Sequence, residues 1–78
     1  MVTKSQECVN FGKSVRGYRE KRGMSQEELA AAASIHRTYI GGIERGERNP
    51  TLRMIYRLAK ALHIEPFMLL SKPDRQSA

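Results

Sequence analysis

The sequence predicts an all-α fold, a compact domain of five helices. In several stretches, apolar side chains recur at the spacing of one helical face. Capping residues or a proline precede these stretches, and glycine follows some of them. The sequence has no alternating run of β-branched residues and no Asn-Gly hairpin signal, so strands are not expected.

Composition narrows the class of partner. The 78 residues suffice for one small domain, a size that buries about 60% of the surface exposed by the unfolded chain. A formal net charge of +6 and a pI near 10.0 favour a polyanionic partner, nucleic acid first and an anionic membrane surface second. No apolar run approaches the roughly 20 residues of a membrane span, and the first residues lack the apolar core of a signal peptide. We therefore expect a soluble, cytoplasmic protein.

Catalytic and metal-binding chemistry are not indicated. Cys8 is the only cysteine, which excludes an internal disulfide and a cysteine cluster for zinc. Neither Cys8 nor His63 has a suitable catalytic partner. Glu27 and Glu28 are adjacent, so on a helix their side chains diverge rather than form an acid/base pair. We expect no enzymatic activity, metal, cofactor or small-molecule ligand.

The first helix is expected over residues 8–22. Phe11, Val15 and Tyr18 follow the i, i+4, i+7 spacing of one helical face. Gly23 then provides a C-terminal stop.

Two short helices joined by a tight turn form the centre of the chain. Ser25 and Glu28 make a capping box, Ser-x-x-Glu, which starts a helix over about 26–32. A turn at 33–35 leads to a second helix of the pair over about 37–45.

The outer face of that second helix is short, cationic and flat. The residues that share it are Arg37, Thr38, Gly41 and Arg45. Gly41 and Gly42 are adjacent, and each costs about 1 kcal/mol relative to alanine inside a helix. The pair of glycines therefore indicates close approach of another surface, and the face as a whole suits nucleic acid.

Two further helices complete the predicted fold. Thr51 caps a helix over 52–62, whose apolar residues keep helical periodicity. Pro66, at the tolerated first position, opens a last short helix.

Polar segments flank the predicted domain. Residues 1–7 are expected to form a flexible N-terminal arm, and residues 71–78 a flexible C-terminal tail. The helix-turn-helix domain itself is expected over residues 8–70.

Four short blocks of the sequence resemble the lambda-repressor-like, Xre-type helix-turn-helix family. They occupy residues 25–30, 39–40, 43–46 and 49–52, in the order and spacing of the family. The resemblance covers about residues 11–70 and implies a DNA-binding domain that reads sequence. Within residues 37–49 the chain is also similar to the controller proteins of restriction–modification systems, which bind operators as dimers.

The resemblance implies base-reading positions near the start of the second helix of the pair. Arg37 and Thr38 match them, and Gly41 matches a position whose small side chain admits the helix to the major groove. A bidentate pair between Arg37 and guanine discriminates by about 1–3 kcal/mol. The alternatives are that Arg37 contacts phosphate alone and that the glycines serve helix packing.

The family's phosphate-contacting positions surround this helix. They are matched by Gln26, His36, Tyr39, Arg45, Arg48, Asn49 and Thr51. The family glutamine that Gln26 matches can also brace a side chain of the second helix of the pair. The alternative is a solvated side chain for Gln26, Arg45, Arg48, Asn49 and Thr51, and packing of the ring against the core for Tyr39. Arg19 and Glu44 match a partly buried salt bridge of the family, which is a structural role.

Two positions depart from the family pattern. Ser34 stands in the turn where glycine is usual, and it is strained if that position is left-handed. His36 stands where a small capping residue is common. A phosphate contact by its imidazole would make DNA binding mildly pH-sensitive.

The last short helix carries more apolar surface than a small core needs from it. The residues assigned to a homodimer interface are Ile64, Phe67, Met68, Leu69 and Leu70. A twofold dimer would set two recognition helices about 34–36 Å apart, which matches a palindromic operator. The alternative is that this helix only caps the core of the monomer.

The leading hypothesis is a dimeric, sequence-specific transcriptional regulator whose partner is double-stranded DNA, and specifically a controller protein of a restriction–modification system. The alternatives are an antitoxin-like or bridging protein-interaction module of the same fold, and a phage or plasmid repressor. Which operator is bound, and whether binding activates or represses, stays open at this level.

Overall fold

Five helices make up the computed structural model, which describes residues 5–71. In chain order they are α1 (Gln6–Lys21), α2 (Gln26–Ala33), α3 (Arg37–Glu44), α4 (Leu52–Leu62) and α5 (Pro66–Leu70). The described residues contain no strand, so the all-α prediction is confirmed for them. None of these helices is long and apolar enough to span a bilayer.

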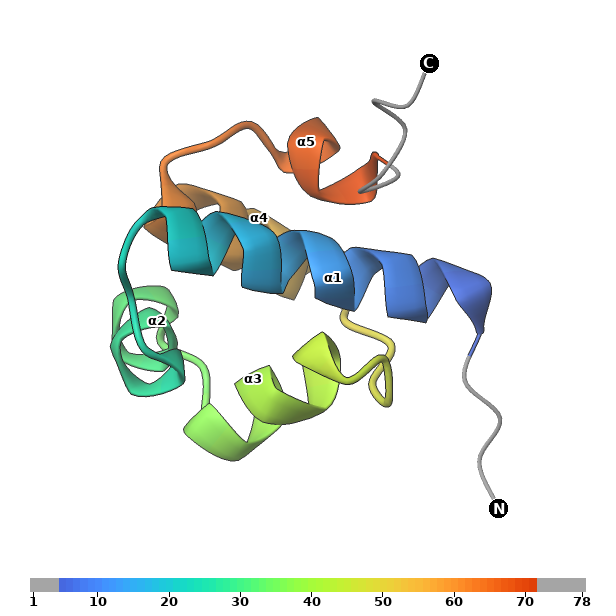
Figure 1. Cartoon of the computed structure of the whole chain (residues 1–78), viewed down its shortest axis with the longest axis horizontal. Helices are drawn as coiled ribbons and strands as arrows, with labels where there is room; N and C mark the ends of the chain where they lie inside the picture. The colour runs from blue at the N-terminus through green and yellow to red at the C-terminus, as the bar shows by residue number, and fades with distance from the viewer. Residues whose placement is uncertain (1–4, 72–78) are drawn as a thin grey trace.

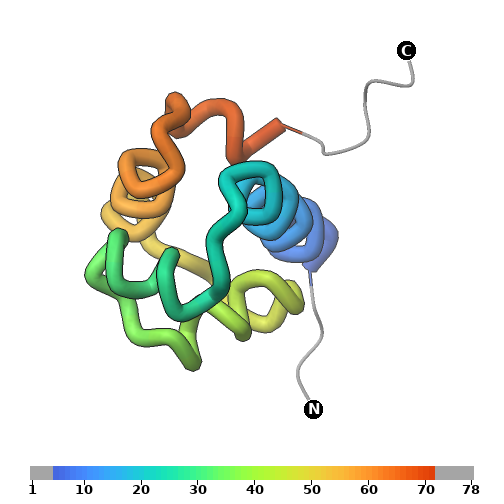
Figure 2. Tube along the Cα trace, turned by 60° about the vertical axis from the view of Figure 1, so that its left-hand side comes forward, coloured from blue at the N-terminus to red at the C-terminus, as the bar shows by residue number. Residues whose placement is uncertain are grey.

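The longest helix, α1, runs across the whole molecule (Figure 1). It packs against α3 and α4, and α5 covers it from the other side. The α2 helix packs against α3 and α4, so that α2 and α3 form the predicted helix–turn–helix pair. Figure 2 shows this pair below α1 and α4. The two faces of α1 therefore separate the helix pair from α5.

The core lies where these helices meet. Its largest fully buried side chains are Val15, Leu29, Ile40, Ile43, Leu58, Leu62 and Leu69. Leu69 was assigned to the dimer interface, and that assignment is wrong, because the side chain has no exposed surface in the monomer. The α5 helix packs against both α1 and α4, and this packing turns Leu69 into the core.

The close crossing of α1 and α3 depends on Gly12. A Cβ atom at this position would clash with the backbone carbonyl oxygen of Ile43 and would lie 2.8 Å from that of Glu44. Gly12 is therefore a contact point between the middle of α1 and the end of α3. The sequence held no periodicity or turn signal that distinguished it from Gly17, whose Cβ would meet nothing within 4 Å.

Helix α1 begins earlier than predicted. Ser5 caps it, with the side-chain oxygen accepting a 3.0 Å hydrogen bond from the Cys8 amide. The predicted arm is therefore too long, since Gln6 and Glu7 belong to the first helical turn. These residues are polar and show no apolar periodicity, so the capping residue Ser5 was the only sign in the sequence of where α1 begins. The rest of the predicted arm, residues 1–4, lies outside the described residues.

The other boundaries agree closely with the prediction. The capping box of Ser25 and Glu28 is present, α2 ends one residue later than expected, and α3 ends one residue earlier. The α4 helix has the predicted bounds, with Thr51 as its cap, and Pro66 stands at the start of α5. Of the predicted tail only Ser71 is described, and its carbonyl accepts a 3.3 Å hydrogen bond from the Ser14 hydroxyl.

Ser34 adopts the left-handed conformation, in which we expected a serine to be strained. Its φ is 57° and its ψ is 44°, and it forms the C-cap of α2. The amide of the next residue, Ile35, donates to the carbonyl of Ala30 at 3.0 Å, so the turn closes in the manner usual for a left-handed C-cap. This turn sets the direction in which α3 leaves α2. His63 has the same conformation at the end of α4, with a φ of 60°.

Candidate nucleic-acid interface

A largely buried ion pair fixes the helix pair to α1. The Nε atom of Arg19 lies 2.6 Å from Oε2 of Glu44, and its Nη2 atom lies 3.1 Å from Oε1. The side chains are only 12% and 4% exposed. The third nitrogen, Nη1, donates to the carbonyl of Met24 at 2.7 Å. The hydrogen bond to Glu44 raises the pKa of Arg19, against the opposing effect of burial, so the guanidinium stays charged. Arg19 and Glu44 therefore form the salt bridge that the sequence indicated.

Gln26 shares the same carboxylate. Its side-chain amide donates to Oε1 of Glu44 at 3.0 Å, which ties the first turn of α2 to the last turn of α3. The family resemblance implied that Gln26 contacts a phosphate and can brace a side chain of the second helix of the pair, and Glu44 of α3 is the side chain that it holds. Half-buried and held by Glu44, Gln26 has an orientation set by the salt bridge beneath it.

Arg37 is the first residue of α3 and is exposed. Its Nε atom lies 3.3 Å from Oε2 of Glu27, in the first turn of α2, and the two side chains are 54% and 67% exposed. A backbone hydrogen bond at Glu27 and, second, the charge of Arg37 hold the pKa of the Glu27 carboxyl below its usual range. Sequence reasoning gave Glu27 no partner, because residues ten positions apart on different helices share no local pattern.

His36 caps α3 through its ring. The Nδ1 atom accepts a 3.2 Å hydrogen bond from the backbone amide of Thr38. An imidazole that accepts at Nδ1 is neutral and carries its hydrogen on Nε2. Nε2 is then the donor that His36 can offer to a phosphate. Thr38 itself is exposed, next to Arg37 on the first turn of α3.

The two adjacent glycines of α3 lie under arginine side chains. A Cβ atom at Gly41 would be 3.1 Å from Nη1 of Arg45, and one at Gly42 would be 2.8 Å from Cγ of Arg48. The guanidinium of Arg48 also stacks 5.2 Å from the centroid of the Tyr39 ring. The nearest neighbours of both positions are therefore arginine side chains, although a Cβ atom at Gly41 would also lie 3.8 Å from Oε1 of Gln26 in α2.

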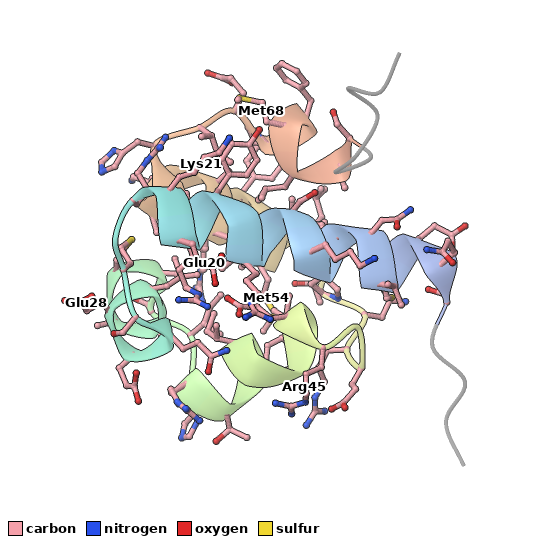
Figure 3. All side chains as sticks on the ribbon, in the orientation of Figure 1. Glu20, Lys21, Glu28, Arg45, Met54 and Met68 are labelled. Atoms are coloured by element: carbon pink, nitrogen blue, oxygen red, sulfur yellow. The ribbon has the colours of Figure 1, made fainter. Side chains whose placement is uncertain are left out.

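The remaining predicted contacts lie beyond the end of α3. Arg45 lies on the side of α3 that faces away from α1 (Figure 3), and its Nε atom is 3.1 Å from Oε2 of Glu47. Asn49 is exposed. The Thr51 hydroxyl accepts from the Met54 amide at 3.2 Å, so part of its polar capacity serves the cap of α4.

The residues predicted for a dimer contact do not form one surface. Phe67 and Leu70 are 66% and 63% exposed, whereas Ile64 and Met68 are half-buried and Leu69 is in the core. Two exposed apolar residues of α4 were missed: Leu52 at 69% and Tyr56 at 58%. Their i, i+4 spacing on the outer face of α4 was a signal in the sequence. The exposed apolar side chains thus belong to both α4 and α5, two helices that pack against each other.

The arrangement of these elements matches known proteins. The family pattern described as helix-turn-helix matches residues 15–69. The chain belongs to this helix-turn-helix family. It is 48% identical over 62 residues to the control protein C.SmaI of Serratia marcescens, covering 80% of this chain and 74% of that protein.

Solved structures agree with this membership. The restriction–modification controller protein C.AhdI from Aeromonas hydrophila superposes with a TM-score of 0.82 at 46% identity, covering 83% of this chain and 98% of that one. The controller protein C.Esp1396I has been crystallised as a tetramer with its natural 35-base-pair operator. Its chain superposes with a TM-score of 0.78 at 32% identity, covering 85% of this chain and 87% of that one. This helix-turn-helix chain is thus related to restriction–modification controllers.

Proposed function

We propose that this chain is a controller of a restriction–modification system, which binds a palindromic operator as a homodimer and performs no enzymatic reaction. The observation that carries the proposal is the exposed first turn of α3, where Arg37 and Thr38 stand side by side, about one turn before Gly41. A helix that presents an arginine and a hydroxyl at its N-terminal end suits base edges in the major groove. The kinship with control proteins supports the same function. The proposal includes a cytoplasmic location, where the DNA partner would be.

In this proposal Arg37 and Thr38 read bases, and Gly41 lets the helix approach the groove. Phosphates are held by the polar groups around them: Gln26, His36, Tyr39, Arg45, Arg48, Asn49 and Thr51. Such contacts fix the register of the protein on the duplex without reading its sequence. Arg45 and Arg48 lie over the two glycines, and their long side chains can swing from the helix surface to a phosphate without displacing backbone.

The dimer is proposed to form through the exposed apolar side chains of α4 and α5. Leu52 and Tyr56 contribute from α4, and Phe67 and Leu70 from α5. A twofold pairing of this surface sets the two α3 helices on successive major grooves, about 34–36 Å apart.

The test is selection of bound duplexes from a random DNA library at one stated salt concentration. The proposal expects an enriched inverted repeat. Arg37→Ala should erase the preference at one base position of each half-site, whereas Arg48→Ala should weaken binding about equally on every sequence. The absence of any enriched sequence would refute the sequence-reading function.

A second function is favoured by the same exposed apolar surface. A protein-interaction module, such as an antitoxin-like or bridging domain, would use Phe67 and Leu70 to hold a different protein. It would tolerate the loss of Arg37 and Arg48 but not of those two residues. Sedimentation of the purified chain separates the two functions. Self-association of the wild-type chain, together with a monomeric Phe67→Ser variant, would support the homodimer.

A further inference from the structure

The ion pair between Glu27 and Arg37 connects the first turns of α2 and α3. It is made through Nε of Arg37, 3.3 Å from Oε2 of Glu27. A guanidinium carries five N–H donors, of which Nε supplies one and the two terminal nitrogens supply four. A carboxylate on Nε therefore leaves Nη1 and Nη2 able to donate in parallel to another acceptor pair, such as O6 and N7 of guanine.

A carboxylate in this position has a cost for a DNA-binding protein. Glu27 follows Gln26, a proposed phosphate contact, and its side chain is 67% exposed. A glutamate is charged at neutral pH, and the pKa of Glu27 is lowered further by its backbone hydrogen bond and by the charge of Arg37. A negative charge next to the DNA backbone opposes binding to every sequence, because non-specific affinity comes from neutralised phosphates.

Stability does not explain the pair. Both partners are more than half exposed, and exposed ion pairs contribute little to folding. The capping box of α2 is made by Glu28, so Glu27 is not needed to cap the helix. A favourable interaction with the helix dipole accounts for an acidic residue in the first turn, but not for its contact with residue 37.

We propose that Glu27 is a specificity-determining residue that acts by positioning Arg37. It holds the guanidinium by Nε so that the terminal nitrogens meet a guanine, and its charge disfavours the use of Arg37 as a phosphate contact. Binding to the correct base is thereby favoured over binding to DNA in general. This inference rests on the proposed function, in which Arg37 reads a base.

The experiment compares Glu27→Gln with the wild-type chain. Affinities are measured for the duplex selected from the random library and for a duplex of equal length with scrambled half-sites, at two salt concentrations. Glutamine keeps the size and removes the charge. We expect binding to the scrambled duplex to rise about two- to fivefold, because one repulsive charge is removed. Binding to the selected duplex should stay equal or fall, so that the ratio of the affinity for the selected duplex to that for the scrambled duplex drops about twofold or more.

Glu47→Gln is the matched control. Glu47 pairs with Arg45 through the same kind of contact, Nε to Oε2 at 3.1 Å, but Arg45 is a proposed phosphate contact rather than a base reader. The same charge is lost, so both duplexes should be bound more tightly by the same factor, with the ratio unchanged. A second readout is repeated library selection: Glu27→Gln should lose preference at the base position that Arg37→Ala loses, and at no other.

Three outcomes would overturn the inference. Equal gains in affinity for both duplexes would mean that Glu27 acts only as a repulsive charge. A rise in the ratio of selected to scrambled affinity would mean that Glu27 keeps Arg37 from contacting the base. If Glu27→Gln lowered the ratio of selected to scrambled affinity as much in the Arg37→Ala protein as in the wild-type chain, Glu27 would act independently of Arg37. Failure of the proposed function gives a different result, since Arg37→Ala would then leave the base preferences of the protein unchanged.

Discussion

Arg19 and Glu44, 25 residues apart in the chain, hold α3 against α1 through two hydrogen bonds of 2.6 and 3.1 Å. The same carboxylate receives the amide of Gln26. One buried charge thus sets the position of three elements: the end of α1, the start of α2 and the end of α3. The proposed DNA-contacting surface depends on this pair for its shape, although neither charged partner belongs to it.

Glu44→Ala should therefore destabilise the fold severely. It leaves the guanidinium of Arg19 largely buried without its carboxylate, which costs about 3–5 kcal/mol in the free energy of unfolding. Urea unfolding followed by circular dichroism measures the change. The control is Glu20→Ala, which breaks the exposed pair with Arg16 and should cost about 0.5 kcal/mol or less. Similar losses in the two variants would contradict the structural role of Glu44.

Alanine substitution at two glycines of α1 should have opposite effects. Gly17→Ala adds a methyl group that meets nothing within 4 Å, so we expect a stabilisation of about 1 kcal/mol from helix propensity. Gly12→Ala places the same group against the backbone carbonyls of Ile43 and Glu44, which cannot move aside as a side chain can. Thermal unfolding should show a higher Tm for the first variant and a large loss for the second. A stable Gly12→Ala protein would show that α1 and α3 do not cross as closely as described.

Gly42→Ala should separate DNA affinity from stability. The added Cβ would lie 2.8 Å from Cγ of Arg48, so this side chain must turn about its first bond and leave the ring of Tyr39. Helix propensity favours alanine by up to about 1 kcal/mol and offsets the cost of that displacement, so the stability should change little. Affinity should fall by a similar factor on all duplexes, because Arg48 is a proposed phosphate contact. Fluorescence anisotropy on selected and scrambled duplexes measures it, and unchanged affinity on both would argue against a role for Arg48.

The neighbouring leucines of α5 should differ in what they stabilise. Leu69→Ala removes a fully buried side chain and should cost about 2–5 kcal/mol in the free energy of unfolding of the monomer. Leu70→Ala changes a side chain that is 63% exposed, so the monomer should keep its stability while the dimer weakens. Unfolding at low protein concentration and sedimentation equilibrium measure the two effects. An unaltered dimer with Leu70→Ala would remove this residue from the proposed interface.

The carboxyl of Glu27 should titrate below the usual glutamate range. A lowered pKa in the folded state means that its contribution to stability is present above the ordinary pKa, about 4.3, and is lost as the pH falls through the lowered value. Carbon-13 NMR of the side chain follows the titration directly. In Arg37→Ala the pKa should rise only partly, because the backbone hydrogen bond, its largest cause, remains. An identical pKa in both proteins would mean that the ion pair is not populated in solution.

Local chemistry made much of this structure predictable. The Ser25–Glu28 capping box, the bounds of α4 and the proline at the start of α5 depend on residues within four positions of one another, and each was anticipated. The family of the chain could also be predicted from the sequence, because the motifs that indicate it are short, contiguous stretches. The Arg19–Glu44 pair was indicated only through that resemblance, since no local pattern links residues so far apart.

The tertiary structure decided what depends on contacts between helices. Leu69 and Leu70 are adjacent and chemically identical, and only the docking of α5 against α1 and α4 determines which one is buried. The neighbours of Gly41 and Gly42, the partner of Glu27 and the importance of Gly12 likewise follow from how α1, α2 and α3 approach one another in space. The amino-acid sequence by itself thus determined the helices and the family of the chain. Which faces those helices cover, and which they leave exposed, depends on long-range packing that no local pattern encodes.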